Sequence, residues 1–179
     1  MKSNSFHTSF QINGKIFSNS EELIKYSQSI SKEINQFLKE WFSDTHYVLV
    51  NTSGSTGIPK TIKLRKDFMI NSALATGRYF QLGENTKALC CLPIKFIAGK
   101  MMLVRALSLG WDLDVIESTS NPLQEITKEY DFSAMVPLQV RNSISKIDQI
   151  KTLIVGGGVV SRELKKAIQT IDTNCYATY

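Results

Sequence analysis

The spacing of apolar and polar positions changes along the chain and predicts where helices and strands lie. From residue 21 to residue 42 the apolar side chains recur every three or four positions, which predicts one amphipathic helix. Ser20 is its expected N-cap, and Glu21 and Glu22 stand in its first turn. Residues 1–20 are mostly polar and predict only a short strand within 10–17.

Beyond residue 46, short apolar runs alternate with helical patterns. Strands are expected at 47–50, 61–64, 88–92, 113–116, 132–136, 152–155 and 175–178. Helices are expected at 66–80, 98–109, 123–130 and 162–171, with a helical turn near Leu138. Several strand runs are apolar throughout, as in sheets covered on both faces. The order predicts an α/β fold, a layered and largely parallel sheet flanked by helices, which binds ligands at the carboxyl ends of its strands.

Composition narrows the class of protein. The 179 residues are 42% hydrophobic and 21% charged, which excludes a disordered or fibrous chain. Three cysteines (Cys90, Cys91 and Cys175) and two isolated histidines lack the spacing of a zinc site or a disulfide framework. We therefore predict no metal site and reduced thiols in a cytoplasmic protein. No secretory signal is evident, and no apolar run reaches the roughly 20 residues that span a membrane.

The net charge of +5, from 21 Lys and Arg against 16 Asp and Glu, is spread along the chain. Such an excess suits an anionic ligand such as a nucleotide, and equally a mildly basic solvated surface. Dispersed charge without interleaved aromatic residues argues against a nucleic-acid partner.

The most informative stretch is the loop expected between the strands at 47–50 and 61–64. It reads Thr52-Ser53-Gly54-Ser55-Thr56-Gly57-Ile58-Pro59-Lys60. Glycines let backbone N–H groups converge on an anion, hydroxyls add neutral donors, and a lysine adds positive charge for phosphate oxygens. It is not a Walker A loop, because Pro59 stands where that motif has glycine and a strand follows instead of a helix.

This loop resembles the phosphate-binding signature of the adenylate-forming enzymes, which include the acyl- and aryl-CoA synthetases. The signature, Ser/Thr-Gly-Ser/Thr-Thr-Gly-x-Pro-Lys, is met at every position. The resemblance implies that the loop holds the β- and γ-phosphates of ATP. The residues that would do so are Thr52, Ser53, Gly54, Ser55, Thr56, Gly57 and Lys60.

Residues 92–99, Leu-Pro-Ile-Lys-Phe-Ile-Ala-Gly, resemble the segment that borders the acyl pocket in this family. Lys95 and Phe96 replace the usual aromatic residue and histidine. The resemblance gives Lys95, Phe96, Gly99 and Lys100 as candidate acyl-pocket residues. Lys95, Lys100 and Arg105 are cations for a substrate with an extra carboxylate, or else ordinary solvated charges.

A glycine run at 156–158 follows an expected strand, and Ser161 is a good N-cap for the next helix. Alone, the run is a near miss to a dinucleotide fingerprint, and no acidic residue ends a following strand at the expected distance. The resemblance implies instead that Gly156, Gly157 and Gly158 line the adenine and acyl pocket, and that Tyr179 stacks on adenine.

The resemblance covers about residues 47–179, so we expect an N-terminal extension at 1–46 and a partial AMP-binding domain at 47–179. The family's magnesium-binding glutamate and catalytic lysine have no counterpart in these residues, so no catalytic residue is assigned and we expect the 179 residues alone not to turn over. The short start and the run Ile-Ala-Gly-Lys-Met-Met-Leu-Val-Arg-Ala most resemble the o-succinylbenzoate–CoA ligases of menaquinone synthesis. The implied substrates are a small carboxylic acid, ATP with Mg2+, and CoA.

Two other interpretations stay open. A non-catalytic nucleotide- or phosphate-binding module would keep the loop and bind MgATP without forming an adenylate. A dinucleotide-dependent oxidoreductase that uses the glycine run would bind NAD even after Lys60→Ala.

Overall fold

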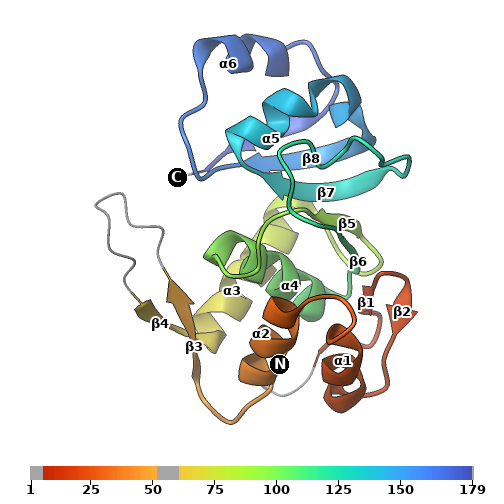
Figure 1. Ribbon diagram of the computed structural model, residues 1–179, viewed down its shortest axis with the longest axis vertical. Coiled ribbons are helices and arrows are strands. Elements are labelled where there is room, and N and C mark those ends of the chain that lie inside the picture. The colour runs from red at the N-terminus through yellow and green to blue at the C-terminus, as the bar shows by residue number, and fades with distance from the viewer. Residues whose placement is uncertain (1–5, 52–60, 179) are drawn as a thin grey trace.

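A seven-stranded sheet runs through the molecule in the order β2-β1-β6-β5-β7-β8-β9, and the computed structural model describes residues 6–51 and 61–178 (Figure 1). Its strands are β1 (Gln11–Ile12), β2 (Lys15–Ile16), β5 (Lys87–Cys90), β6 (Asp112–Val115), β7 (Tyr130–Met135), β8 (Ile150–Val155) and β9 (Asn174–Ala177). Every neighbouring pair is parallel except the β1–β2 hairpin. A separate antiparallel pair consists of β3 (Tyr47–Asn51) and β4 (Thr61–Arg65).

Helices cover both faces of the sheet. The α-helices are α1 (Ser20–Ser27), α2 (Lys32–Trp41), α3 (Lys66–Phe80), α4 (Ile97–Leu109), α5 (Pro137–Asn142) and α6 (Arg162–Ile168), and η1 (Ile144–Gln149) is a 3-10 helix. In Figure 1, α5 and α6 lie on one side of β7 and β8, while α3 and α4 lie on the other, with α1 and α2 beyond them. The layered α/β fold with a largely parallel sheet is confirmed.

The sheet alternates its side chains between two cores. Phe132 and Ala134 of β7 face the core beneath α3 and α4, whereas Met135 faces the core beneath α5 and α6. In β5, Ala88 and Cys90 lie on the first side and Leu89 on the second. This two-sided burial explains why these strands are apolar throughout.

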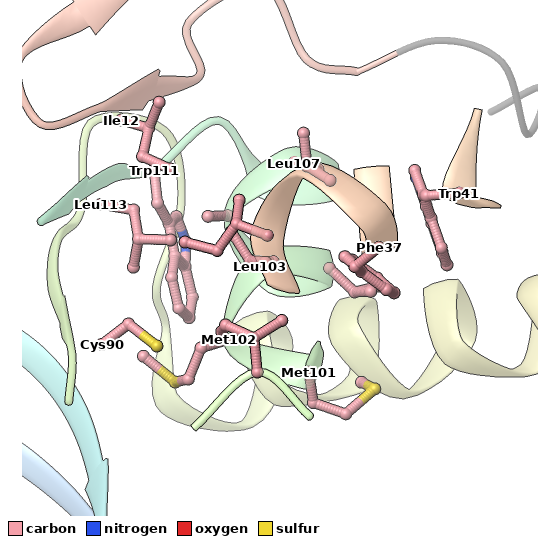
Figure 2. Close-up of a cluster of buried hydrophobic side chains, with 14 of the residues drawn as sticks. Ile12, Phe37, Trp41, Cys90, Met101, Met102, Leu103, Leu107, Trp111 and Leu113 are labelled. Atoms are coloured by element: carbon pink, nitrogen blue, oxygen red, sulfur yellow. The ribbon is translucent and has the colours of Figure 1, made fainter. Parts of the chain in front are cut away.

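Helix α4 is buried along most of its length, because the sheet lies on one side of it and α2 on another. Figure 2 shows Leu103 and Leu107 of α4 between Trp111 and Leu113 on one side and Phe37 and Trp41 of α2 on the other, all in one core cluster. A helix buried on all sides has no polar face, which fits the run from Met101 to Val104. No helix within 6–51 and 61–178 is long and apolar enough to cross a bilayer.

The single helix expected at 21–42 is wrong, because two helices occupy the region. Ser31 begins a second helix by accepting a hydrogen bond from the Ile34 N–H (3.1 Å). The Asn35 amide joins the two helices by donating to Ile24 O (2.7 Å) and Ser27 Oγ (3.0 Å). The N-cap of the first helix is Asn19, one residue before the expected Ser20.

The helix expected at 123–130 is also wrong: the segment forms turns, and β7 begins at Tyr130. Leu123 is fully buried, so the apolar spacing reflects packing and not a helix. Side chains of η1 take the carbonyls that a helix would use. Lys146 Nζ donates to Gln124 O (2.6 Å), and Gln149 Nε2 donates to Ile126 O (3.1 Å).

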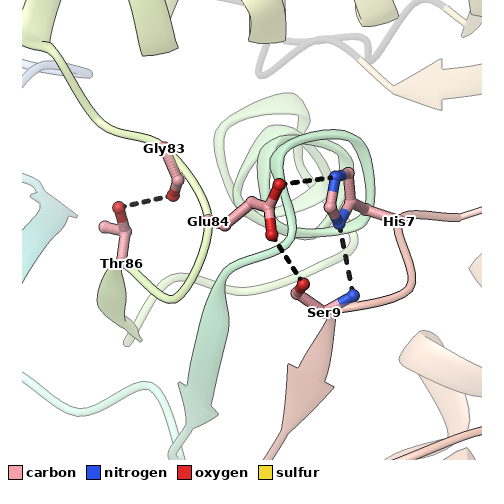
Figure 3. Close-up of polar contacts among 5 residues, drawn as sticks. All are labelled: His7, Ser9, Gly83, Glu84 and Thr86. Atoms are coloured by element: carbon pink, nitrogen blue, oxygen red, sulfur yellow. Dashed lines mark hydrogen bonds and ion pairs between the residues drawn. The ribbon is translucent and has the colours of Figure 1, made fainter.

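The N-terminal segment is fixed to the main sheet. Strand β1 pairs with β6, and the His7 N–H donates to Leu107 O (2.8 Å). Figure 3 shows the side chains involved: His7 Nε2 lies 3.5 Å from Glu84 Oε1, and Ser9 Oγ donates to Glu84 Oε2 (2.9 Å). Gly110, at φ +73°, leaves room for the imidazole, since a Cβ there would lie 2.5 Å from His7 Nδ1. The proposed division at residue 46 stays a prediction.

We predict that the buried thiols make the protein less stable in alkali. Burial raises the pKa of Cys90 to about 11 and that of Cys91 to about 12, from 9.0. Between these values the folded state binds more protons than the unfolded state, so the free energy of unfolding falls as pH rises. Each thiol contributes a loss of roughly 1 kcal/mol between pH 8 and pH 10.

The measurement is urea unfolding at pH 8 and pH 10, for the wild type and for Cys90→Ala/Cys91→Ala. The double variant is less stable at pH 8 because it leaves cavities, but it loses less stability on going to pH 10. Equal losses in the two proteins would contradict the prediction.

Candidate functional site

The carboxyl ends of four neighbouring strands, β5, β7, β8 and β9, lie along the same end of the sheet, called here its carboxyl edge. Because they are parallel, the segments that follow them lie side by side at this carboxyl edge. The Gly156 N–H donates to Met135 O (3.1 Å), and the Thr178 N–H donates to Val155 O (2.9 Å). The edge therefore brings together the glycine run and the start of the 92–99 segment, both of which the sequence assigned to the site.

Contacts and backbone conformation within the chain favour glycine at two of the three positions of the run, Gly156 and Gly157. A Cβ on Gly156 would lie 2.5 Å from Thr178 Oγ1, so the side chain at the end of β9 occupies that space. Gly157 has φ +74°, which disfavours other residues. Gly158 lies against Pro137, at 3.5 Å from an ideal Cβ to Cδ. The run thus forms a floor that is exposed at Gly157 and Gly158 and lies against α5 and the end of β9.

Gln139 is a buried residue of this edge that the sequence analysis missed. Its Nε2 donates to Cys91 O (3.0 Å) and to Thr119 O (2.9 Å), and its Oε1 accepts from the Val136 N–H (3.2 Å). One amide thus satisfies backbone groups after β5, after β7 and in the segment beyond β6. A polar residue two positions after a helix-initiating proline was its only sequence signal.

The 92–99 segment turns sharply into α4 at Gly99. A Cβ on Gly99 would lie 2.4 Å from Pro93 O, so no other residue fits there without moving the backbone. Lys95 and Phe96 stand exposed on this turn, with Lys95 Nζ 5.0 Å from the centroid of the Phe96 ring.

The structure does not place Lys100 with Lys95 and Phe96. Lys100 is 9% exposed, and its Nζ lies 5.0 Å from the centroid of the Phe37 ring on α2. Burial lowers the pKa of its ammonium group, and the nearby charge of Glu40 opposes that shift. Of the four acyl-pocket candidates, two are exposed on the turn and two are buried beyond it.

Arg105, the third cation near this segment, lies between α3, α4 and the sheet. Its Nε donates to Thr76 Oγ1 (3.3 Å), and its guanidinium carbon lies 5.9 Å from the centroid of the Phe132 ring. Burial lowers its pKa to about 10, so it stays charged at neutral pH. Among the described residues, no carboxylate forms an ion pair with it.

The phosphate-loop residues Thr52, Ser53, Gly54, Ser55, Thr56, Gly57 and Lys60, and also Tyr179, lie outside the described residues. The strands that flank the loop, β3 and β4, form a regular hairpin with Asn51 opposite Thr61. The expected order of strand, loop and strand is confirmed at its two ends.

Two hollows lie away from the assigned residues. One of about 360 Å³ is lined by Arg141, Ile144 and Leu164, among others, and one of about 310 Å³ by Asp114, Lys128 and Tyr130, among others. Within the part of the chain that is described, no three His, Cys, Asp or Glu side chains are grouped to hold a metal ion.

Comparison with known proteins agrees with this arrangement. The family described as AMP-binding enzyme matches residues 9–179. The chain therefore belongs to the AMP-binding enzyme family, the adenylate-forming ligases, and its sheet and helices match the N-terminal domain of AMP-forming acyl-CoA synthetases.

Individual relatives are similar to this chain over only part of their own length. The chain is 28% identical over 138 residues to a linear gramicidin synthase of Brevibacillus parabrevis (72% of this chain, 2% of that protein). It is 25% identical over 134 residues to 2-succinylbenzoate–CoA ligase of Escherichia coli K12 (72% and 28%). An acyl-CoA synthetase (AMP-forming)/AMP-acid ligase II-like protein of Dyadobacter fermentans has 36% identity and a TM-score of 0.75 (82% and 44%). The chain thus spans less than half the length of each relative.

We predict that Gly99→Ala destabilises the protein by roughly 1–3 kcal/mol, the usual cost of overpacking, because its Cβ would meet the Pro93 carbonyl. Gly83→Ala is the matched control, since nothing lies within 4 Å of a Cβ there. Chemical denaturation of both variants tests this. If Gly99→Ala were as stable as Gly83→Ala, the packing account of the turn would be wrong.

Proposed function

We propose that this chain is part of an ATP-dependent acid–CoA ligase that first adenylates a carboxylate and then forms a thioester. The observation that carries the proposal is the complete phosphate-binding signature at 52–60, which stands between the paired strands β3 and β4 of an AMP-binding enzyme. A cytoplasmic location is part of the same proposal.

In the first step, a carboxylate oxygen of the acid attacks the α-phosphorus of ATP, and the bond from that phosphorus to pyrophosphate breaks. In the second, the CoA sulfur attacks the acyl carbon and AMP leaves. Such chemistry depends chiefly on positioning and on stabilising charge. Lys60 and the loop hydroxyls would stabilise the negative charge of the departing pyrophosphate. The floor of Gly156, Gly157 and Gly158 would carry the adenine ring, with Tyr179 stacked on it.

Mg2+ belongs to the proposal as a companion of ATP, but the described residues offer no cluster to hold it. No step is therefore assigned to a metal ligand of this chain. CoA is proposed as the second substrate, and we propose that turnover needs residues besides these 179.

For the acid we propose o-succinylbenzoate, an aromatic acid with a second carboxylate. The 2-succinylbenzoate–CoA ligase among the relatives supports this identity. Of the three cations near the acyl segment, Arg105 fits a carboxylate best. It is desolvated, its charge is not offset by a described carboxylate, and a buried unpaired charge is costly. Lys95 is exposed, and Lys100 points to α2.

We predict that Lys60→Ala lowers the rate of acid-dependent ATP–pyrophosphate exchange roughly 100-fold, as expected for loss of one charge-stabilising donor. The assay uses the natural gene product with MgATP and o-succinylbenzoate. Lys39→Ala, an exposed lysine on α2, is the matched control and keeps the wild-type rate.

Exchange that requires the acid supports the ligase. MgATP binding without exchange would support the non-catalytic module instead. NAD binding that survives Lys60→Ala would contradict both interpretations and support a dinucleotide-dependent oxidoreductase.

We further predict that Arg105→Met lowers the preference for o-succinylbenzoate over benzoate, measured as a ratio of kcat/KM values. A hydrogen bond to a charged group contributes about 1.5–3 kcal/mol, so the ratio falls roughly 10- to 100-fold. Arg78→Met, an exposed arginine on α3, leaves the ratio unchanged. An unchanged ratio of kcat/KM values in Arg105→Met would show that Arg105 does not bind the second carboxylate of the acid.

A further inference from the structure

The β3–β4 pair is separate from the seven-stranded sheet (Figure 1), and it is held by the burial of Val48 and Val50 in the core and by contacts at its base. Two of these come from Lys66, the first residue of α3. Its N–H donates to His46 O (2.9 Å), and its Nζ donates to Ser43 O (2.8 Å). Together they hold both the entrance to β3 and the exit from β4.

A third contact comes from Glu40, in the last turn of α2. Glu40 Oε1 accepts the Leu49 N–H at 2.6 Å. This N–H lies on the edge of β3 that faces away from β4, so a carboxylate takes the place of a neighbouring strand. Charge-assisted bonds of this kind are short and stronger than neutral ones.

Glu40 also stands near two buried cations. Lys66 is 1% exposed and Lys100 is 9% exposed. Burial lowers the pKa of both ammonium groups, and the charge of Glu40 opposes that shift in each. Asp44 adds to this effect at Lys66. Glu40 thus combines a bond to the strand edge with the charge that balances the cations beneath it.

We propose that Glu40 is a positioning residue for the phosphates of ATP, because it fixes the strand pair that flanks residues 52–60. The inference rests on the proposed function of that loop. Positioning of the reacting groups contributes a large part of such rate enhancements, and a displacement of about 1 Å can cost 100-fold. Glu40 acts through its bond to β3 and through its charge near Lys66 and Lys100, not by contact with the substrate.

The two functions of Glu40 can be separated by substitution. Glu40→Gln keeps an oxygen that can accept the Leu49 N–H but removes the negative charge near Lys66 and Lys100. Glu40→Ala removes both. Glu33→Ala is the matched control, since Glu33 lies exposed in the first turn of the same helix.

The experiment measures KM for ATP, KM for the acid and kcat by ATP–pyrophosphate exchange on the natural gene product. In Glu40→Ala, KM for ATP rises roughly 10-fold or more while KM for the acid stays within about twofold of wild type. Glu40→Gln shows a smaller rise, and Glu33→Ala shows none. Hydrogen exchange of the Leu49 amide, which is protected in the wild type and fast in Glu40→Ala, reports the strand contact directly.

A purely structural role would lower kcat in proportion to the folded fraction and leave KM for ATP unchanged, which would overturn the inference. If Glu40→Ala fails to fold, an unchanged KM for ATP in Glu40→Gln overturns it. If the wild type shows no exchange at all, the proposed function fails, and the inference is judged by calorimetric binding of MgATP. Weaker binding in Glu40→Gln then supports it, and equal binding overturns it.

Discussion

Burial of both faces of the central strands is the constraint on which the rest of the structure depends. Strands β5, β7 and β8 have helices above and below, so their backbone groups must be satisfied by neighbouring strands, which here are parallel. Parallel pairing in turn requires every connection to return across a face, which brings the ends of the strands to one edge. At that edge the ladder stops, and Gln139 supplies the hydrogen bonds that strands no longer provide. The glycine run then lies on a backbone that has little freedom to move.

Elements whose ends are determined by nearby residues could be predicted from the sequence. The helix at 66–80 was found to the residue, because a charged start and a break at Gln81 limit its apolar stripe. Strands β3, β5 and β8 were found within two residues at each end. One error, the single helix at 21–42, has a local cause, because the N-cap Ser31 begins a second helix there. The other depends on distant groups. The turns at 123–129 depend on side chains of η1 that follow about 20 residues later, and no local spacing reveals them.

The candidate site divides in the same way. The glycine run could be placed at a strand end from sequence, since a buried strand and a helix N-cap frame it. The packing reason for Gly156 could not be predicted, because its contact with Thr178 joins segments that follow two different strands. Lys95, Lys100 and Arg105 looked equivalent in the sequence. The structure separates them: Lys95 is exposed on the turn before α4, and on α4 itself Lys100 faces α2 and Arg105 faces the sheet. The directions of Lys100 and Arg105 cannot be read from hydrophobic spacing, because apolar residues surround both of them along α4.

The two parts of the proposed ATP site therefore rest on different kinds of support. The glycine floor is held by main-chain pairing of β7, β8 and β9, which is rigid and insensitive to the charge of any one side chain. The strand pair that flanks the phosphate loop is held at its base by side-chain bonds from Glu40 and Lys66. Val48 and Val50 of β3 are also buried in the core that contains α2 and α4, so apolar packing holds the pair together with these bonds. It follows that the nucleoside end of a bound nucleotide would meet a surface fixed by main-chain pairing, whereas the position of its phosphates would depend on side-chain packing and on the bonds from Glu40 and Lys66.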